Sequence, residues 1–199
     1  MELVDGLTDI TPGKLATIVT SLQMFEAPEL PDFKTAFTAS LAKISHPDID
    51  WYLRLYRRVG EDWLWFSRLQ ENPSKLESII RNPSVEIFSL TVGDEEKGLL
   101  ELDFRTNREC ELAFLGITQD LQGRGFGSQL LNYGIKQAWS KPINRLWVHT
   151  CTLDHPRALV LYQQAGFVPF KIQLEVLDDP RLNGTIPKAA APHVPLIEQ

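Results

Sequence analysis

The stretch LQGRGFG, residues 121–127, places a glycine at every second position. Glycine is favoured where the backbone needs a positive φ angle or must come close to another group. A glycine-rich turn that leads into a helix is typical of a tight bend, of a phosphate-binding loop or of a dinucleotide-binding fingerprint. The three alternatives imply different proteins, and the residues around the turn discriminate between them.

Two nucleotide-binding fingerprints do not fit this turn. The dinucleotide pattern requires a third glycine where Ser128 stands, and the Walker pattern requires a lysine directly after Gly127. Two interpretations remain. Either the unpaired N–H groups at the start of the helix hold a phosphate, or Gly123, Gly125 and Gly127 only permit a tight turn and close packing of the helix.

The segments on both sides of the turn predict an α/β fold. Before the turn, three apolar runs separated by short polar turns predict an antiparallel meander, and after it helices alternate with strands. The chain from residue 32 to 70 has helical character, with apolar residues between Trp51 and Val59 on one face. The expected strands are 14–23, 85–92, 99–104, 110–117, 145–152 and 167–177, and the later expected helices are 126–139 and 156–165.

The composition excludes several classes of protein. The 199 residues, 43% hydrophobic and 23% charged, fit one folded globular domain. The formal net charge of −6 provides no positive field for nucleic acid, and no segment approaches the roughly 18 apolar residues of a membrane span. Cys110 and Cys151 give no disulfide framework, and the N-terminus has no signal-peptide pattern. We therefore expect a cytoplasmic protein without nucleic-acid or membrane partners.

Two separated motifs resemble those of the GCN5-related N-acetyltransferase (GNAT) family. The run from Gln122 to Gly127 fits the acyl-coenzyme A (acyl-CoA) binding pattern Q/R-x-x-G-x-G/A. Downstream, Ala158, Leu161-Tyr162 and Gly166-Phe167 resemble a helix with A-x-x-L-Y that is followed by G-F at the start of the last strand. The resemblance covers residues 80 to 177 and implies a mixed, mostly antiparallel sheet flanked by helices, with a splayed central strand before the glycine turn.

The resemblance also implies how the chain is divided. A single N-acetyltransferase domain spans residues 1–178, with an acceptor-side part at 14–80 and an acyl-CoA-binding part at 81–178. Residues 179–199 are rich in proline and alanine and show no period, so we expect a C-terminal tail there.

Members of the family bind acetyl-CoA as a co-substrate and need no metal. By resemblance, the N–H groups of the glycine turn hold the pyrophosphate, and Arg124 either adds a charge to a phosphate or is an ordinary exposed residue. The backbone of the splayed strand pairs with the pantetheine arm, and Gly116 favours a bulge there. His155 replaces a frequent asparagine and either contacts the pantetheine or starts the helix. The expected cofactor-binding residues are Leu115, Ile117, Gln122, Gly123, Arg124, Gly125, Gly127, Ser128 and His155.

Acetyl transfer to an amine requires an oxyanion donor, a base and a proton for the leaving thiolate. The resemblance assigns the first role to the N–H of Leu115. Tyr162 matches the tyrosine that protonates the thiolate, and its alternative role is packing. Glu111, at the start of the splayed strand, is the candidate base, and its alternative is a solvated strand end.

The aromatic segment before residue 67 occupies the region that covers the acceptor in similar enzymes. Trp63, Trp65 and Phe66 either surround the amine or belong to the core, and His149 is expected to line the site. The spacing H-x-C-x-x-x-H from His149 to His155 has no fourth ligand at zinc spacing. Because the family transfers the acetyl group directly, we expect neither a metal site nor a nucleophilic Cys151.

The sequence therefore predicts an enzyme that moves an acetyl group from acetyl-CoA to a primary amine of a small molecule or peptide, by direct transfer in a ternary complex. A non-catalytic acyl-CoA-binding module on the same fold, or an enzyme with a different acyl donor, is the alternative. The acceptor stays open between small molecules and peptides, and the protein is expected to be a monomer or a homodimer.

Overall fold

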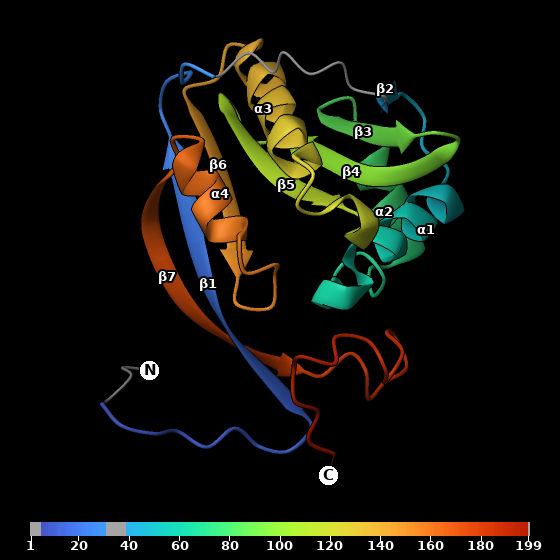
Figure 1. The fold of residues 1–199 in the computed structure, drawn as a ribbon, viewed down its shortest axis with the longest axis vertical. Helices are drawn as coiled ribbons and strands as arrows, with labels where there is room; N and C mark the ends of the chain where they lie inside the picture. The colour runs from blue at the N-terminus through green and yellow to red at the C-terminus, as the bar shows by residue number, and fades with distance from the viewer. Residues whose placement is uncertain (1–4, 31–38, 199) are drawn as a thin grey trace.

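The computed structural model describes residues 5–30 and 39–198. They form one seven-stranded sheet with helices on both faces (Figure 1). The expected strands and helices from residue 85 onward are present, with ends shifted by no more than two residues except in the strand expected at 99–104. That strand begins four residues earlier, at Glu95, because residues of the expected turn pair with Thr91 and Val92. In chain order the elements are β1 (Lys14–Met24), β2 (Ala39–Ile44), α1 (Ile49–Gly60), η1 (Glu61–Trp63), α2 (Pro73–Ile80), β3 (Val85–Val92), β4 (Glu95–Asp103), β5 (Glu109–Ile117), η2 (Gln119–Leu121), α3 (Phe126–Trp139), β6 (Arg145–Cys151), α4 (Ala158–Gln164) and β7 (Val168–Asp178).

The sheet has the strand order β2-β3-β4-β5-β6-β1-β7, and its strands are antiparallel except for the pair β5–β6. This parallel pair is joined only where Glu109–Glu111 lie opposite Arg145–Trp147. Beyond these residues the two strands separate, which is visible near the middle of Figure 1. The mixed sheet with a splayed central strand is therefore confirmed.

The bulge in β5 lies at Ala113 and not at Gly116, where the sequence suggested it. The register of β5 against β4 shifts between Leu112 and Phe114, whereas Gly116 pairs regularly with Leu99. Gly116 is required for a different reason: a Cβ atom there would stand 2.4 Å from a methyl group of Val59. This glycine therefore lets α1 approach the splayed strand.

Two parts of the N-terminal region differ from the helical segment expected at 32–70. Residues 39–44 form the edge strand β2, which pairs with β3 from Ala39↔Val92 to Ile44↔Ile87. The composition of ASLAKI favours a helix, but pairing with an existing strand overrides a weak propensity. The expectation for residues 32–38 lies outside the described part of the chain. The helix α1 is shorter, and Asp48 caps it by accepting a 3.0 Å hydrogen bond from the N–H of Trp51.

The first strand is present as expected, but its position was not predicted. β1 lies between β6 and β7 and is antiparallel to both. β1 therefore connects β7 with the rest of the sheet, and β7 is an edge strand.

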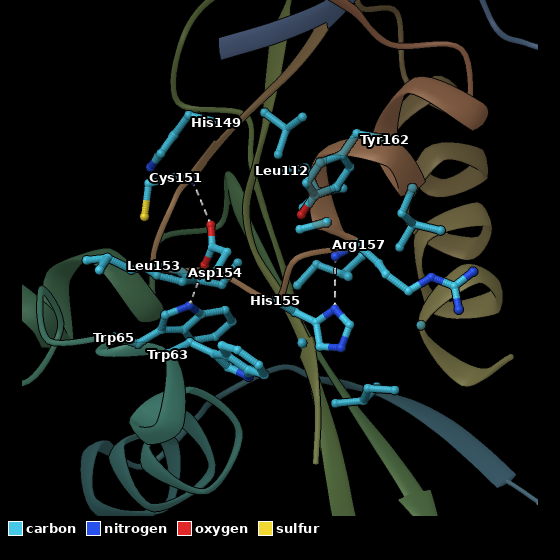
Figure 2. Close-up of a pocket in the computed structure, with 18 of the residues that line it drawn as sticks. Trp63, Trp65, Leu112, His149, Cys151, Leu153, Asp154, His155, Arg157 and Tyr162 are labelled. Carbon is cyan, nitrogen blue, oxygen red and sulfur yellow. Dashed lines mark hydrogen bonds between the residues drawn. The ribbon is translucent and has the colours of Figure 1, made fainter. Parts of the chain in front are cut away.

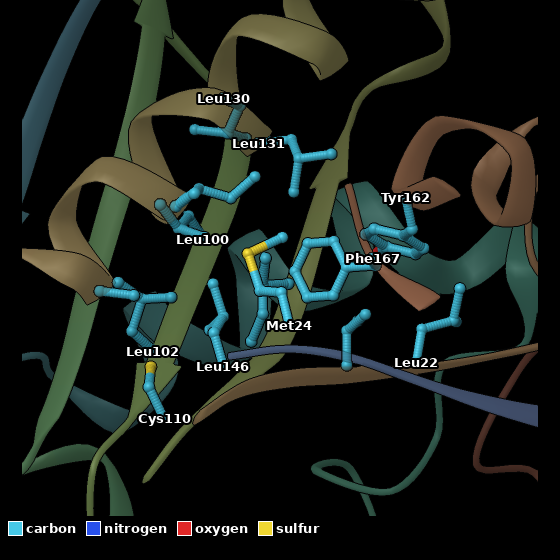
Figure 3. Packing of buried hydrophobic residues seen from close by; sticks show 14 of the residues in the cluster. Leu22, Met24, Leu100, Leu102, Cys110, Leu130, Leu131, Leu146, Tyr162 and Phe167 are labelled. Carbon is cyan, nitrogen blue, oxygen red and sulfur yellow. The ribbon is translucent and has the colours of Figure 1, made fainter. Parts of the chain in front are cut away.

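The helices cover opposite faces of the sheet. α3 and α4 pack on one face over a cluster of aliphatic residues around Met24, Tyr162 and Phe167 (Figure 3). α1 and α2 pack on the other face, where Tyr52 and Tyr56 are fully buried. No helix in the described ranges is long and apolar enough to cross a bilayer.

A buried polar group lies under α1. The carboxylate of Glu101 is fully buried, accepts a 2.6 Å hydrogen bond from the hydroxyl of Tyr52 and lies 2.5 Å from the guanidinium of Arg68. Arg68 follows the aromatic segment directly. The ion pair therefore fastens that segment to β4.

Within residues 179–198, several side chains pack against the domain. Arg181 is buried, forms a 2.7 Å ion pair with Asp179 and donates to the carbonyl of Val194 at 2.9 Å. Ile186 is buried in a cluster that also contains Leu64 from the aromatic segment. The segment expected as a tail thus lies against the aromatic segment.

Candidate active site

A cavity of about 530 Å³ opens where β5 and β6 separate. Its volume lies within the range of small-ligand sites, about 300 to 1,000 Å³. One end is lined by the glycine turn and the start of α3, and the other by the aromatic segment and the outer strands β1 and β7. Figure 2 shows Tyr162 on one side and Trp63 and Trp65 on the other. The cavity therefore connects the two faces of the sheet.

The glycine turn forms one wall of this cavity. Gly123 and Gly125 have φ angles of +70° and +85°, in the left-handed region that L side chains rarely adopt. Gly125 is the N-cap of α3 and has no side chain with which to cap it. The first N–H groups of a helix have no acceptor within it, and here those of Gly127 and Ser128 lie at the cavity wall. The helix start is thus suited to an anion.

Gln122 also lines the cavity, but Arg124 does not. The guanidinium of Arg124 lies 5.5 Å from the ring centre of Phe126 on the exposed side of the turn. Arg157, directly before α4, does line the cavity and was not singled out from the sequence. Among the described lining residues, the arginine that lines the cavity is thus the residue before α4 and not the arginine of the glycine turn.

The splayed strand turns backbone groups toward the gap. The N–H of Thr118 donates to the carbonyl of Lys97 at 2.8 Å. Because backbone groups alternate along an antiparallel strand, the N–H and C=O groups of Gly116 and Phe114 also face β4. Leu115 and Ile117 fall between these positions, and their N–H and C=O groups point away from β4. β6 pairs with β5 only up to Glu111, so no strand in the described part of the chain covers these groups.

Tyr162 lines one side of the cavity. Its ring is buried and packs edge-on against Phe167 at 5.9 Å between ring centres. The hydroxyl forms no hydrogen bond with any residue that the structure describes, and it points toward the cavity in Figure 2. Burial, with a smaller effect of Asp154, raises the pKa of Tyr162 well above its ordinary value. The phenol therefore keeps its proton at neutral pH.

His149 and Glu111 are brought together at the side of the gap. Nδ1 of His149 lies 3.3 Å from Oε1 of Glu111. His149 lines the cavity, whereas Glu111 contacts His149 but does not line the cavity. The hydrogen bond to Glu111 raises the pKa of His149 and outweighs the opposing effect of burial. The group that faces the cavity is therefore the imidazole, and the carboxylate orients it.

The three aromatic residues expected on the acceptor side all line the cavity. Trp65 also belongs to the core, since its ring packs 5.4 Å from Tyr56 and its indole N–H donates to Asp154 at 3.2 Å. Trp63 lies between two histidines, with its ring centre 5.2 Å from that of His155 and 5.5 Å from that of His193. Trp65 therefore both packs on the core and lines the cavity, and a role of this segment around an amine stays a prediction.

His155 starts α4. Its Nδ1 accepts a 3.1 Å hydrogen bond from the N–H of Arg157, and its carbonyl accepts from the N–H of Ala158 at 2.8 Å. The sequence predicted a helix that begins at Pro156. Because these bonds form a turn over residues 155–158, α4 begins at Ala158 instead. The proton of a neutral His155 therefore resides on Nε2.

Cys151 lines the cavity but has the character of a structural thiol. Burial, followed by the nearby carboxylate of Asp154, raises its pKa, which disfavours the reactive thiolate. Asp154 itself accepts hydrogen bonds from the hydroxyl of Thr150 at 2.7 Å and from the N–H of Cys151 at 2.9 Å. Among the described residues, no group of three or more His, Cys, Asp and Glu side chains is arranged around a metal position.

Several lining residues could not be found from the sequence. Thr17 and Val19 come from β1, and Glu175 and Leu177 come from β7. They reach the cavity because β1 is inserted beside β6, with Val19 opposite Cys151. No local motif marks such residues, since their place depends on strand pairing far along the chain.

Comparison with known proteins agrees with this geometry. The model of the acetyltransferase (GNAT) family matches residues 49–167. No curated protein sequence matches the chain. Residues 49–167 include the aromatic segment, the splayed strand, the glycine turn and the helix of Tyr162.

The fold is shared by solved structures at low sequence identity. A functionally unknown conserved protein from Staphylococcus epidermidis has 16% identity and a TM-score of 0.54, with 84% of this chain and 63% of that chain covered. An aminoglycoside acetyltransferase from an uncultured soil metagenomic sample has 15% identity and a TM-score of 0.52, with coverages of 65% and 88%. An IAA acetyltransferase from Bacillus cereus has 19% identity and a TM-score of 0.52, with coverages of 67% and 79%. The chain thus spans less than two thirds of the length of the Staphylococcus protein.

The match to the family model covers more than half of the chain, and the motifs within it line one cavity. The protein therefore belongs to the GNAT family of acetyltransferases.

Proposed function

We propose that this enzyme transfers the acetyl group of acetyl-CoA to a primary amine of a small molecule or peptide, directly and within a ternary complex. The observation that carries the proposal is the cavity through the sheet at the β5–β6 gap. An anion-binding helix start lies at one end, and a wall of aromatic side chains with a histidine lies at the other. Such a passage lets a cofactor and an acceptor meet from opposite faces.

The cofactor half fits acetyl-CoA. The N–H groups of Gly125, Gly127 and Ser128 offer donors to a pyrophosphate at the positive end of the α3 dipole. Arg157 supplies a cation on the same side and takes the role expected of Arg124. The strand-like pantetheine amides find partners in the free backbone groups of Leu115 and Ile117.

The acceptor half fits a cation with an apolar body. The only positively charged lysine or arginine among the cavity residues that the structure describes is Arg157, on the cofactor side. Asp154 and Glu175 supply negative charge, and the rings of Trp63 and Phe66 supply apolar contact and cation–π attraction. Hydrophobic amines are therefore the acceptors to test first.

The chemistry follows from the placement of three groups. The neutral imidazole of His149, held by Glu111, accepts the proton of the bound ammonium, directly or through water, and releases the nucleophile. The amine nitrogen forms a bond to the acetyl carbon while the N–H of Leu115 stabilises the developing oxyanion. The C–S bond breaks, and Tyr162 gives its proton to the departing thiolate. The nitrogen gives up its second proton as the amide forms, and this proton returns to Tyr162 directly or through water, while His149 releases the first proton to solvent.

The experiment is a measurement of thiol release from acetyl-CoA in the presence of a panel of amines. The panel pairs aromatic and long-chain amines with polar amines of the same size, and mass spectrometry identifies the acetylated product. We expect thiol release that depends on the amine and yields an equal amount of N-acetyl product. Tight binding of acetyl-CoA with no release above the amine-free rate for any member would overturn the proposal and favour a binding module.

A further inference from the structure

The edge strand β7 is unusually exposed for its length and composition. All of its eleven residues except Leu177 are solvent-exposed. Ile172, Leu174 and Val176, on one face, have exposed fractions of 71%, 41% and 49%, and Ile18 of the neighbouring strand extends the patch with 41%. A long apolar edge strand of this kind is a template for pairing with another chain.

The backbone of β7 is free to pair along its outer side. The N–H and C=O groups of Ile18 both point toward β6, where they bond with Thr152 at 3.2 and 3.1 Å. Ile18 lies opposite Leu174, so these two form a pair without mutual hydrogen bonds, and the groups of Leu174 point outward. By alternation, the groups of Ile172 and Val176 point outward too. Pro169, the one proline of the strand, lies before this stretch.

We propose that β7 pairs with β7 of a second copy of this chain, antiparallel and about a twofold axis at Gln173. In this register Ile172 exchanges both backbone hydrogen bonds with the partner's Leu174, and Leu174 does so with the partner's Ile172. Lys171 then stands opposite the partner's Glu175, in the close type of pair, on the other face. The two seven-stranded sheets continue into one another across the axis.

We choose a second copy of this chain as the partner of β7 because the strand is complementary to itself in charge. Lys171 and Glu175 are exposed, and neither forms an ion pair with a residue that the structure describes. A lysine on an edge strand opposes unspecific pairing, and the register about Gln173 neutralises both lysines at once. A shift of the axis by one residue to Leu174 would place Lys171 opposite the partner's Leu177 and lose both ion pairs. A twofold dimer is also the commonest closed assembly.

In this dimer, a residue of the partner would lie near the cavity. Glu175 lines the acceptor end and shares a sheet face with Lys171. The partner's Lys171 would therefore stand beside the rim of each cavity. The dimer does not depend on the proposed reaction, and its tests read only the assembly.

A single cysteine at the axis tests the register. In a pair without mutual hydrogen bonds the Cα atoms are about 4.5 Å apart, within the range that a disulfide spans. Gln173→Cys should therefore form a covalent dimer on mild oxidation that a reductant reverses. The matched control is Glu175→Cys, because two copies of this residue would be about 13 Å apart. The wild type, with its buried Cys110 and half-buried Cys151, sets the background.

A charge exchange gives an independent test by sedimentation of the full chain. The wild type should sediment at twice its mass of 22.6 kDa. Lys171→Glu should raise the dimer dissociation constant about tenfold or more, and the double variant K171E/E175K should restore it. Lys136→Glu, an equal charge change on α3, should have no effect. A monomeric wild type at tens of micromolar without cross-linking of Gln173→Cys would overturn the proposal, as would cross-linking of Glu175→Cys alone.

Discussion

Replacing Tyr162 by phenylalanine removes a single oxygen atom from the cavity and keeps the ring. The ring packs against Phe167 at 5.9 Å and belongs to the main core cluster, so the packing is retained. The hydroxyl has no hydrogen-bond partner among the described residues, so the change leaves no protein group unsatisfied. The free energy of unfolding should therefore change by less than about 0.5 kcal/mol.

The effect on catalysis should be much larger. A positioned proton donor contributes about 10²- to 10⁴-fold to a rate, or about 3 to 5 kcal/mol of the barrier. Tyr162→Phe should lower kcat by this factor and leave the KM for acetyl-CoA nearly unchanged, because the ring that lines the cavity is still present. Steady-state thiol release gives both constants, and thermal denaturation gives the stability.

Tyr133→Phe is the matched control. Tyr133 lies on α3 outside the cavity, with its ring 5.3 Å from Phe88, and the same atom is removed. This variant should keep the wild-type kcat. A Tyr162→Phe enzyme with a kcat within threefold of the wild type, or a parallel fall of kcat and Tm in both variants, would refute the role of the phenol as proton donor.

Three further changes test the base, the glycine turn and the buried ion pair. Glu111→Gln removes the group that raises the pKa of His149, so the acidic limb of the kcat/KM profile should move to lower pH; an unmoved limb would contradict the role of this imidazole as the base. Gly125→Ala and Gly93→Ala both place a side chain at positive φ and should each cost about 1 to 2 kcal/mol of stability in denaturant titrations. Only Gly125→Ala should also raise the KM for acetyl-CoA, about tenfold, and an equal rise in both would argue against the cradle. Arg68→Met leaves a buried carboxylate unpaired and should cost about 3 to 5 kcal/mol, lowering the Tm by about 10 °C, which calorimetry would detect.

The strand, glycine turn and helix that line one end of the cavity could be predicted because they are local in the sequence. Strand, turn and helix follow one another between residues 109 and 139. The φ angles of Gly123 and Gly125 are those that only glycine adopts readily, so the turn is specified by its own residues. The same holds for α3, whose predicted limits, 126 and 139, are those of the structure.

The rest of the fold depends on pairing between distant strands, which one sequence does not encode locally. Residues 39–44 have a helix-favouring composition and become a strand only because β3 offers a partner. β1 carries a recognisable strand pattern, but nothing in it specifies insertion between β6 and β7. The bulge was likewise predicted at Gly116 but lies at Ala113. Gly116 instead allows the close approach of Val59.

The proposed acceptor side is lined by residues that differ in how firmly the fold holds them, and we expect this difference to decide where specificity can change. Trp65 is fixed from several directions: a Cβ atom on Gly60 would meet its ring at 2.4 Å, the ring of Tyr56 packs against it at a tilt, and Asp154 accepts a hydrogen bond from its indole N–H. A residue held in this way cannot adapt to a new acceptor without loss of the core. Thr17 of β1 and Glu175 of β7 face the same cavity from strands near the two ends of the chain. We therefore expect acceptor preference to change through these outer strands, while the fixed aromatic wall sets the space that every acceptor must fit.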